Sequence, residues 1–72
     1  MLDPRLESMV NGYAAAIKAK LLEQQGLGYS GFGDPAMQGA ITNKLKSNLA
    51  EKDWVDVGEC AAMRWAFTNQ KA

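Results

Sequence analysis

The chain has 72 residues, of which eight are basic, eight are acidic and 47% are hydrophobic, with no histidine and a single cysteine. A chain of zero net charge lacks the cationic face that a general DNA or RNA binder needs, and one cysteine without histidine excludes an intrachain disulfide and a structural zinc site. Because no apolar run reaches about 18 residues and residues 1–5 lack the pattern of a signal peptide, we expect a cytoplasmic protein without a membrane span.

A chain of this length allows one domain, which we place at residues 1–72. Domains this small bury only roughly 60% of the surface that the unfolded chain exposes, so they usually rely on disulfides, a metal ion or partner subunits for stability. The sequence offers neither a disulfide nor a structural zinc site. It therefore predicts that the protein assembles with itself, as a homodimer or homotetramer.

The first predicted helix spans residues 3–25. Asp3 and Pro4 form a typical helix start, because Asp caps the first free N–H groups and Pro fits the first helical position. Apolar residues then recur every three or four positions, which is the period of one helix face, and Gly26 is a natural helix end. This apolar stripe comprises Leu2, Leu6, Met9, Val10, Tyr13, Ile17 and Leu21.

Residues 26–33 contain four glycines in eight positions and therefore predict a loop. Asp34 and Pro35 repeat the pattern of a helix start, so we expect a second helix at residues 35–50. The apolar residues of this helix form a stripe with a strict four-residue spacing. The stripe comprises Met37, Ile41, Leu45 and Leu49.

The third predicted helix spans residues 54–69. Asp53 is a good N-cap, and Asp56 at the third helical position resembles a capping box. The helix is apolar over a wide arc, as in helices that are buried on most sides, and in so small a chain this burial requires another subunit. We expect Cys60 and Trp65 in the core. Small residues that permit close approach of another helix are Gly58, Ala61 and Ala62.

These elements predict an all-α fold, in which a three-helix protomer assembles into a helical oligomer.

Residues 26–31 also match the G-x-G-x-x-G pattern of dinucleotide-binding folds. That pattern needs a strand before it and a helix directly after it, whereas here a helix precedes it, so we reject this interpretation. Two alternatives remain. Gly31 and the helix start at Asp34 present backbone N–H groups to a phosphate, or the loop is a flexible connector.

Three carboxylates, Asp53, Asp56 and Glu59, follow one another at a spacing of three. Asp53 flanks a helical face that carries the other two, and carboxylates this close can hold Mg²⁺ with help from a phosphate ligand. The alternative is that the two aspartates cap the helix and that Glu59 is solvated.

Lys18, Lys44 and Arg64 are the cations that we expect at a phosphate group. Tyr29 and Phe32 lie near helix ends, where their rings can stack on a base. The alternative for the lysines is ordinary surface charge. Because no histidine is present to activate a nucleophile, acyl-transfer catalysis by a triad is excluded, and we expect a protein that is not an enzyme.

Two stretches of the sequence, G-Y-S-G-F-G-D-P at residues 28–35 and E-K-D-W-V-D-V at residues 51–57, resemble a large family of short phage-encoded helical proteins. The pattern of that family is G-Y-x-G-W-D-D-P, a helix, then K-G-D-W-V-D-V-A-N-F and an apolar helix that contains Met. The resemblance covers roughly the last 45 residues. The sequence departs from the pattern at Phe32, Gly33 and Glu59.

The D-W-V-D-V stretch is also similar to the last metal-binding helix of the MazG-like nucleotide pyrophosphohydrolases. In that family, two Glu-x-x-Glu/Asp pairs on neighbouring helices bind Mg²⁺. Asp53 and Asp56 match one pair, whereas Glu7 and Glu23 lie too far apart to form the other. The resemblance therefore implies a metal site only if another subunit completes it.

Short phage proteins that form helical oligomers include nucleotide sponges, which sequester cyclic nucleotide signals of bacterial immunity without cleaving them. This small neutral chain is similar to that class, which implies a binder of a small nucleotide in the cytoplasm of an infected bacterium, without a cofactor. Two alternatives stay open. The apolar third helix docks a host protein and inhibits it, or a Mg²⁺-dependent nucleotide pyrophosphohydrolase uses Asp53, Asp56 and Glu59.

Overall fold

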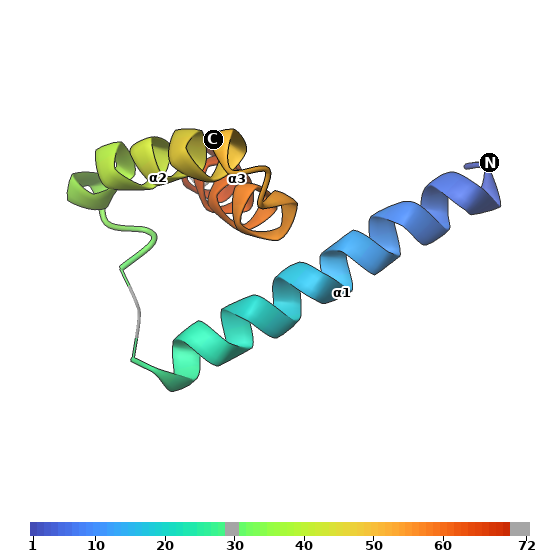
Figure 1. The fold of residues 1–72 in the computed structure, drawn as a ribbon, viewed down its shortest axis with the longest axis horizontal. Coiled ribbons are helices and arrows are strands. Elements are labelled where there is room, and N and C mark those ends of the chain that lie inside the picture. The colour runs from blue at the N-terminus through green and yellow to red at the C-terminus, as the bar shows by residue number, and fades with distance from the viewer. Residues whose placement is uncertain (29–30, 70–72) are drawn as a thin grey trace.

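The computed structural model describes residues 1–28 and 31–69, which form three α-helices and one short 3-10 helix (Figure 1). These are α1 (Pro4–Gly26), η1 (Pro35–Met37), α2 (Gln38–Ala50) and α3 (Trp54–Asn69). The expected all-α class is confirmed, since the described residues contain no strand. No helix within these two ranges combines the length and the apolar character that crossing a membrane requires.

The helices α2 and α3 lie side by side as a hairpin, and α1 passes along one side of this hairpin as a single long rod (Figure 1). Within the described part of the chain, α1 packs against α3, and none of its Cα atoms lies within 8 Å of a Cα atom of α2. Its C-terminal half lies next to the hairpin, whereas its N-terminal half projects away. The attachment of α1 to the hairpin therefore depends on α3.

Aspartate side chains cap the helix starts that the sequence predicts. Asp3 Oδ1 accepts a hydrogen bond at 2.8 Å from the backbone N–H two residues later, and Asp34 Oδ1 does the same at 2.9 Å. Asp53 Oδ1 accepts from the backbone N–H of Asp56 at 3.2 Å. These bonds satisfy N–H groups that the first turn of a helix leaves free. The second helix differs from the prediction only in its first turn, which is the 3-10 helix η1.

The turn between α2 and α3 reverses the chain at Lys52, whose φ is 60°. The Lys52 N–H donates to the Leu49 carbonyl at 3.1 Å, and the Asp53 N–H donates to the Asn48 carbonyl at 3.0 Å. This pair of bonds is the Schellman arrangement of a helix end, which favours glycine because a side chain at positive φ costs free energy.

The packed face of α2 differs from the apolar stripe that the sequence predicts. Ile41 is buried as expected, but Met37 and Leu49 are 43% and 49% exposed. The polar residues Gln38 and Asn48 are buried in their place. The prediction was wrong at its two ends because a strict four-residue spacing drifts around the helix, whereas steps of three and four follow one face. The residues on the packed face are Gln38, Ile41, Leu45 and Asn48.

Cys60 of α3 is buried against this face, as the sequence predicts. The side-chain amide of Asn48 donates to the Cys60 sulfur at 4.0 Å. Buried polar groups are tolerated where they have hydrogen-bond partners, so this weak bond helps Asn48 to replace an apolar residue in the hairpin.

The crossing of α1 and α3 is built around Gly58. A Cβ atom at this position would lie 2.7 Å from the Ile17 Cδ1 atom and closer still to the Tyr13 hydroxyl. The Tyr13 hydroxyl donates a hydrogen bond to the Trp54 carbonyl. The close approach that the sequence predicts at Gly58 is confirmed, and the absence of a side chain is what lets Tyr13 and Ile17 reach α3.

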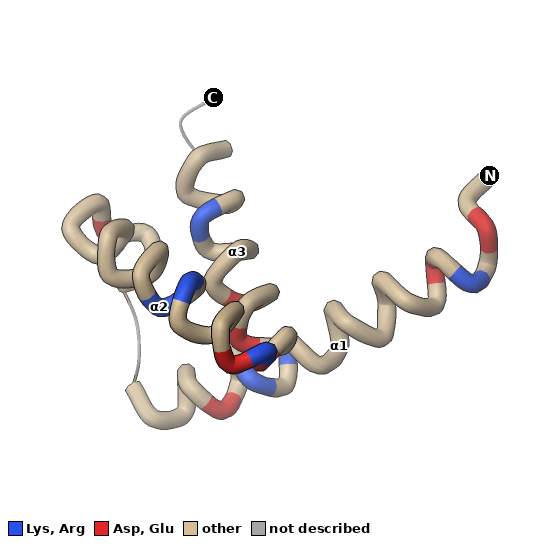
Figure 2. The backbone as a smooth tube through the Cα atoms, turned by 45° about the horizontal axis from the view of Figure 1, so that its top comes forward, with Lys and Arg blue, Asp and Glu red and all other residues tan. Residues whose placement is uncertain are grey.

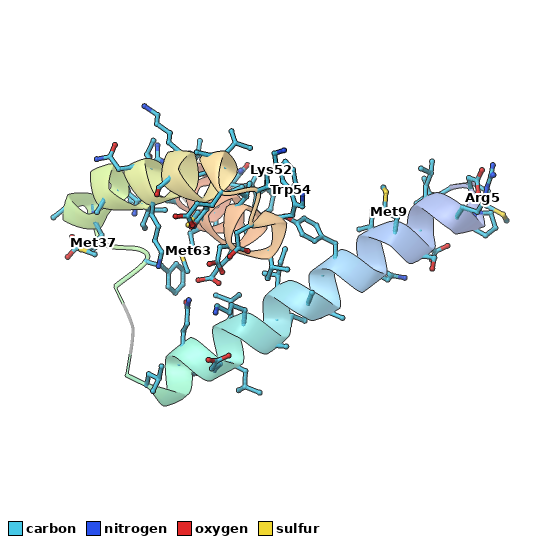
Figure 3. All side chains as sticks on the ribbon, in the orientation of Figure 1. Arg5, Met9, Met37, Lys52, Trp54 and Met63 are labelled. Atoms are coloured by element: carbon cyan, nitrogen blue, oxygen red, sulfur yellow. The ribbon has the colours of Figure 1, made fainter. Side chains whose placement is uncertain are left out.

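The N-terminal half of α1 carries an exposed apolar surface, which we call the α1 stripe. Its exposed fractions run from 47% at Leu6 to 61% at Met9. Figure 2 shows that the middle of α1 carries no charge, and residues 8–17 contain no Asp, Glu, Lys or Arg. Figure 3 places Met9 on the projecting part, away from the hairpin. The stripe comprises Leu2, Leu6, Met9 and Val10.

A second exposed apolar surface lies on the side of α3 that faces away from the packed face. Trp65 is 69% exposed and Trp54 is 56% exposed, so the prediction that Trp65 belongs to the core is wrong for the single chain. The reason is the helical register: Trp65 follows Arg64, which bonds to Gln38 of α2, by one residue and is therefore turned by about 100° around α3 from the side that contacts α2. We call this surface the α3 outer face, and it comprises Trp54, Ala61, Ala62 and Trp65.

Replacement of Gly58 by alanine tests the α1–α3 crossing. Alanine gains roughly 1 kcal/mol of helix propensity, but overpacking costs about 1 to 3 kcal/mol because Tyr13 and Ile17 must move. We expect Gly58→Ala to lower the free energy of unfolding by about 1 kcal/mol net, measured by urea denaturation at fixed protein concentration.

Gly12→Ala is the matched control, because Gly12 also lies inside a helix but a Cβ atom there would meet nothing within 4 Å. This variant should gain roughly 0.5 to 1 kcal/mol. Equal stabilisation by both substitutions would contradict the close crossing.

Candidate functional site

A groove of about 780 Å³ lies between α1 and the α2–α3 hairpin. One wall comes from the C-terminal half of α1, the opposite wall from η1 and α2, and the third side from α3. Gly31 and Phe32, which precede η1, also line the groove. The groove is lined by Lys18, Leu21, Leu22, Gln24, Gln25, Gly31, Phe32, Met37, Ile41, Lys44, Glu59, Cys60 and Met63.

The lining is mostly apolar, with a few polar groups at separate places. Leucines of α1 face the methionines and the isoleucine of the hairpin, and Figure 3 shows Met63 between the hairpin and α1. Lys18 and Lys44 stand on opposite walls, and Glu59 comes from α3. A volume of this size with an apolar lining and few polar groups is typical of small-molecule sites.

The structure brings four of the predicted site residues together at this groove. These are Lys18 of α1, Gly31 and Phe32 of the loop, and Lys44 of α2. They lie far apart in the sequence, and the packing of α1 on α3 places them around one space. Tyr29 lies outside the described residues, so its predicted stacking role stays a prediction.

The loop that carries Phe32 is held by Gln38. The Gln38 side-chain N–H₂ donates to the Phe32 carbonyl at 2.8 Å and to the Asp34 carbonyl at 3.0 Å. Gly31 adopts a φ of 89°, which glycine accepts without strain. These features fix the backbone at the end of the groove, although the Phe32 ring itself is half exposed.

Two predicted site residues have structural roles away from the groove. Arg64 donates from Nη1 to the Gln38 Oε1 atom at 2.7 Å, and its guanidinium lies 5.8 Å from the centre of the Phe67 ring. Asp34 caps η1. The structure therefore uses Arg64 to join α3 to α2 and does not place it on the lining of the groove.

Glu59 lies in an environment that the sequence did not predict. The sequence left it as a solvated carboxylate or a metal ligand, but its side chain is buried, with 4% exposed. The Oε2 atom has no hydrogen-bond partner among the described residues. The burial of Glu59 could not be predicted from its position in the helix, three residues after the half-buried Asp56. It arises because α1 covers this side of α3.

Burial raises the pKa of the Glu59 carboxyl, and the negative charge of Asp56 adds to this effect. The positive charges of Lys44 and Lys20 and a hydrogen bond from the Gln24 side chain act in the opposite direction on the same pKa. Desolvation is the largest of these causes, since a charged carboxylate loses its hydration in the groove.

The same burial affects the neighbouring thiol. Burial, followed by the charge of Glu59, raises the pKa of Cys60, which keeps the thiol protonated and poorly nucleophilic. Asp53 is engaged as the cap of α3. In the described ranges, no three Asp, Glu, Cys or His side chains come close enough to hold a metal ion.

The chain matches no protein-family model, no curated protein and no solved structure.

Replacement of Glu59 by glutamine tests the cost of this buried carboxylate. Because folding raises the Glu59 pKa, the folded state binds more protons than the unfolded state, so its stability falls as the pH rises from 4.5 toward the folded pKa. We expect Glu59→Gln to raise the free energy of unfolding at pH 7 by about 1 to 3 kcal/mol, the usual penalty of an unsatisfied buried polar group. At pH 4 the gain should be much smaller.

Urea denaturation from pH 4 to pH 8 measures this difference, with the exposed Glu23→Gln as control. A gain for Glu59→Gln that is independent of pH, or a loss at pH 7, would show that Glu59 is not a destabilising buried charge.

Proposed function

We propose that this protein is a phage-encoded binder that sequesters a small nucleotide signal of host immunity, without cleaving it, in the cytoplasm of an infected bacterium. The groove is the observation that carries the proposal. It combines an apolar lining with two lysines on opposite walls and the aromatic Phe32 at one end.

The dimensions and chemistry of the groove fit a nucleotide. Pockets of roughly 300 to 1,000 Å³ are usual for ligands of this size, and the groove of about 780 Å³ lies in this range. The leucines, methionines and Phe32 offer apolar surface and a ring for the faces of a base. Lys18 and Lys44 offer positive charge from two sides for a phosphate group.

Binding without turnover agrees with the groups that line the groove. The sequence has no histidine, and burial suppresses ionisation of the Cys60 thiol. Of the three carboxylates that the pyrophosphohydrolase alternative would use, Asp53 serves as a helix cap and Glu59 is buried in the groove. These assignments favour a binding protein over a Mg²⁺-dependent pyrophosphohydrolase.

We also propose that the protein acts as a homodimer or homotetramer through the α1 stripe. Within the stripe, Leu2, Leu6 and Met9 are spaced by four and three, which is the spacing of a coiled-coil seam. A projecting helical segment this short is marginally stable in water unless its apolar face is packed. A second copy of α1 supplies that packing.

A filtration experiment tests nucleotide binding. The purified protein is mixed with linear and cyclic nucleotides in the presence of Mg²⁺ and removed by filtration, and the flow-through is analysed by HPLC before and after heat denaturation. We expect one nucleotide to disappear from the flow-through and to return intact on heating. Lys18→Ala and Lys44→Ala should each weaken its affinity at least about tenfold, since each removes a charge-assisted contact.

Lys46→Ala is the matched control, because Lys46 lies on the same helix as Lys44 but does not line the groove. Return of the nucleotide as a product would identify an enzyme. Retention of every nucleotide in the flow-through would remove the binding proposal.

A substitution in the α1 stripe tests self-association. We expect Met9→Glu to convert the oligomer into a monomer, because a charge in an apolar seam must be desolvated, and size-exclusion chromatography with light scattering measures the mass. The matched control is Asn11→Glu, which places the same charge in the same uncharged stretch but outside the stripe. A monomeric wild-type protein would contradict the proposal.

One observation favours a second candidate function, a module that docks a host protein and inhibits it. The α3 outer face exposes Trp54 and Trp65 beside two alanines, and exposed tryptophans are frequent hot spots of protein interfaces. The filtration experiment separates the two candidates, because an interaction module leaves the nucleotides in solution.

A further inference from the structure

We infer that the nucleotide held in the groove carries guanine and that Glu59 recognises the base. This inference rests on the proposed function and adds the identity of the base to it. The observation behind it is a buried carboxylate oxygen that lines the groove without a hydrogen-bond partner among the described residues.

The side chain of Glu59 is 96% buried, since only 4% of it is exposed. Buried polar atoms in folded proteins almost always have a partner, and one that lacks it in a ligand groove is a candidate contact for the ligand. Glu59 lines both the groove and a smaller recess of about 160 Å³ beside it, which also reaches Leu21, Phe32 and Met63. A ligand that enters deeply therefore meets this carboxylate between apolar side chains.

A carboxylate has only acceptor atoms, so it selects ligands by their N–H groups. Guanine presents two adjacent donors on one edge, the N1–H and the 2-amino group. One of them can donate to the Oε2 atom of Glu59, and the other to the second oxygen, which has a further lone pair beside the one that the Gln24 side chain engages. Adenine and cytosine each place an acceptor nitrogen beside their amino group, so one lone pair would face a carboxylate oxygen. Uracil offers one N–H between two carbonyl groups. The acceptor character of Glu59 therefore favours guanine over the other bases.

Other groups of the groove complete the match. The side-chain amide of Gln25 lines the groove and offers an N–H group for the guanine O6 atom. Leu21, Phe32 and Met63 offer surfaces for the faces of the purine.

Isothermal titration calorimetry on the full chain tests the inference. The probes are the 5′-monophosphates of guanosine, inosine, adenosine and cytidine, together with cyclic di-GMP and cyclic di-AMP. We expect the guanine ligand of each type to bind at least about tenfold more tightly than the adenine ligand. Guanine directs two N–H donors at the Glu59 carboxylate, whereas adenine directs one donor and one acceptor nitrogen that the carboxylate repels. Inosine monophosphate, which lacks the 2-amino group, should fall between the two.

Glu59→Gln should remove the preference for guanine, because an amide offers one acceptor and one donor, while Glu23→Gln on the outside of α1 should retain it. Circular dichroism verifies that both variants are folded. Equal affinity for guanine and adenine ligands in the wild type, or a guanine preference that survives Glu59→Gln, would overturn the inference but leave nucleotide binding intact. Absence of heat with every probe would overturn both.

Discussion

The contact of Tyr13 and Ile17 with Gly58 is the constraint on which the rest of this structure depends. It sets the closest approach of the long helix α1 to the hairpin, because only a residue without a side chain lets α1 come so near to α3. Since α1 packs against α3 and its Cα atoms stay more than 8 Å from those of α2 within the described residues, the space between α1 and α2 stays open as the groove. The groove is thus a consequence of where one glycine lies in α3.

Three buried polar residues show how this small protein divides its interior between structure and function. Gln38 is fully engaged, because it donates to the carbonyls of Phe32 and Asp34 and accepts from Arg64. The side-chain amide of Asn48 donates to the Cys60 sulfur, and its backbone carbonyl accepts from the Asp53 N–H in the hairpin turn. Glu59 alone among them keeps a buried oxygen without a partner. A destabilising group of this kind is expected at a functional position rather than at a structural one.

The features that the sequence predicts well are local ones. Asp3, Asp34 and Asp53 each bond to a backbone N–H two or three residues away, so the pattern around each of them is sufficient to place a helix start. Trp65 and Glu59 were misplaced because their burial depends on neighbouring helices and not on their own helix. Apolar character predicted a core position for Trp65, but the register of α3 turns it to the outside. Charge predicted that Glu59 is solvated or binds a metal ion, but α1 covers this side of α3 and buries it.

The hairpin and α1 also differ in the distance along the chain that their contacts span. The turn around Lys52 joins α2 to α3 over a few residues, whereas the bond of Tyr13 to the Trp54 carbonyl spans 41 positions. Contacts that are local in sequence cost little chain entropy, so we expect the hairpin to form first and α1 to dock last. A molecule in the groove touches both parts, so the detachment of α1 would release it while the hairpin stays folded. The residence time of a bound molecule would then follow how often α1 detaches rather than how often the protein unfolds.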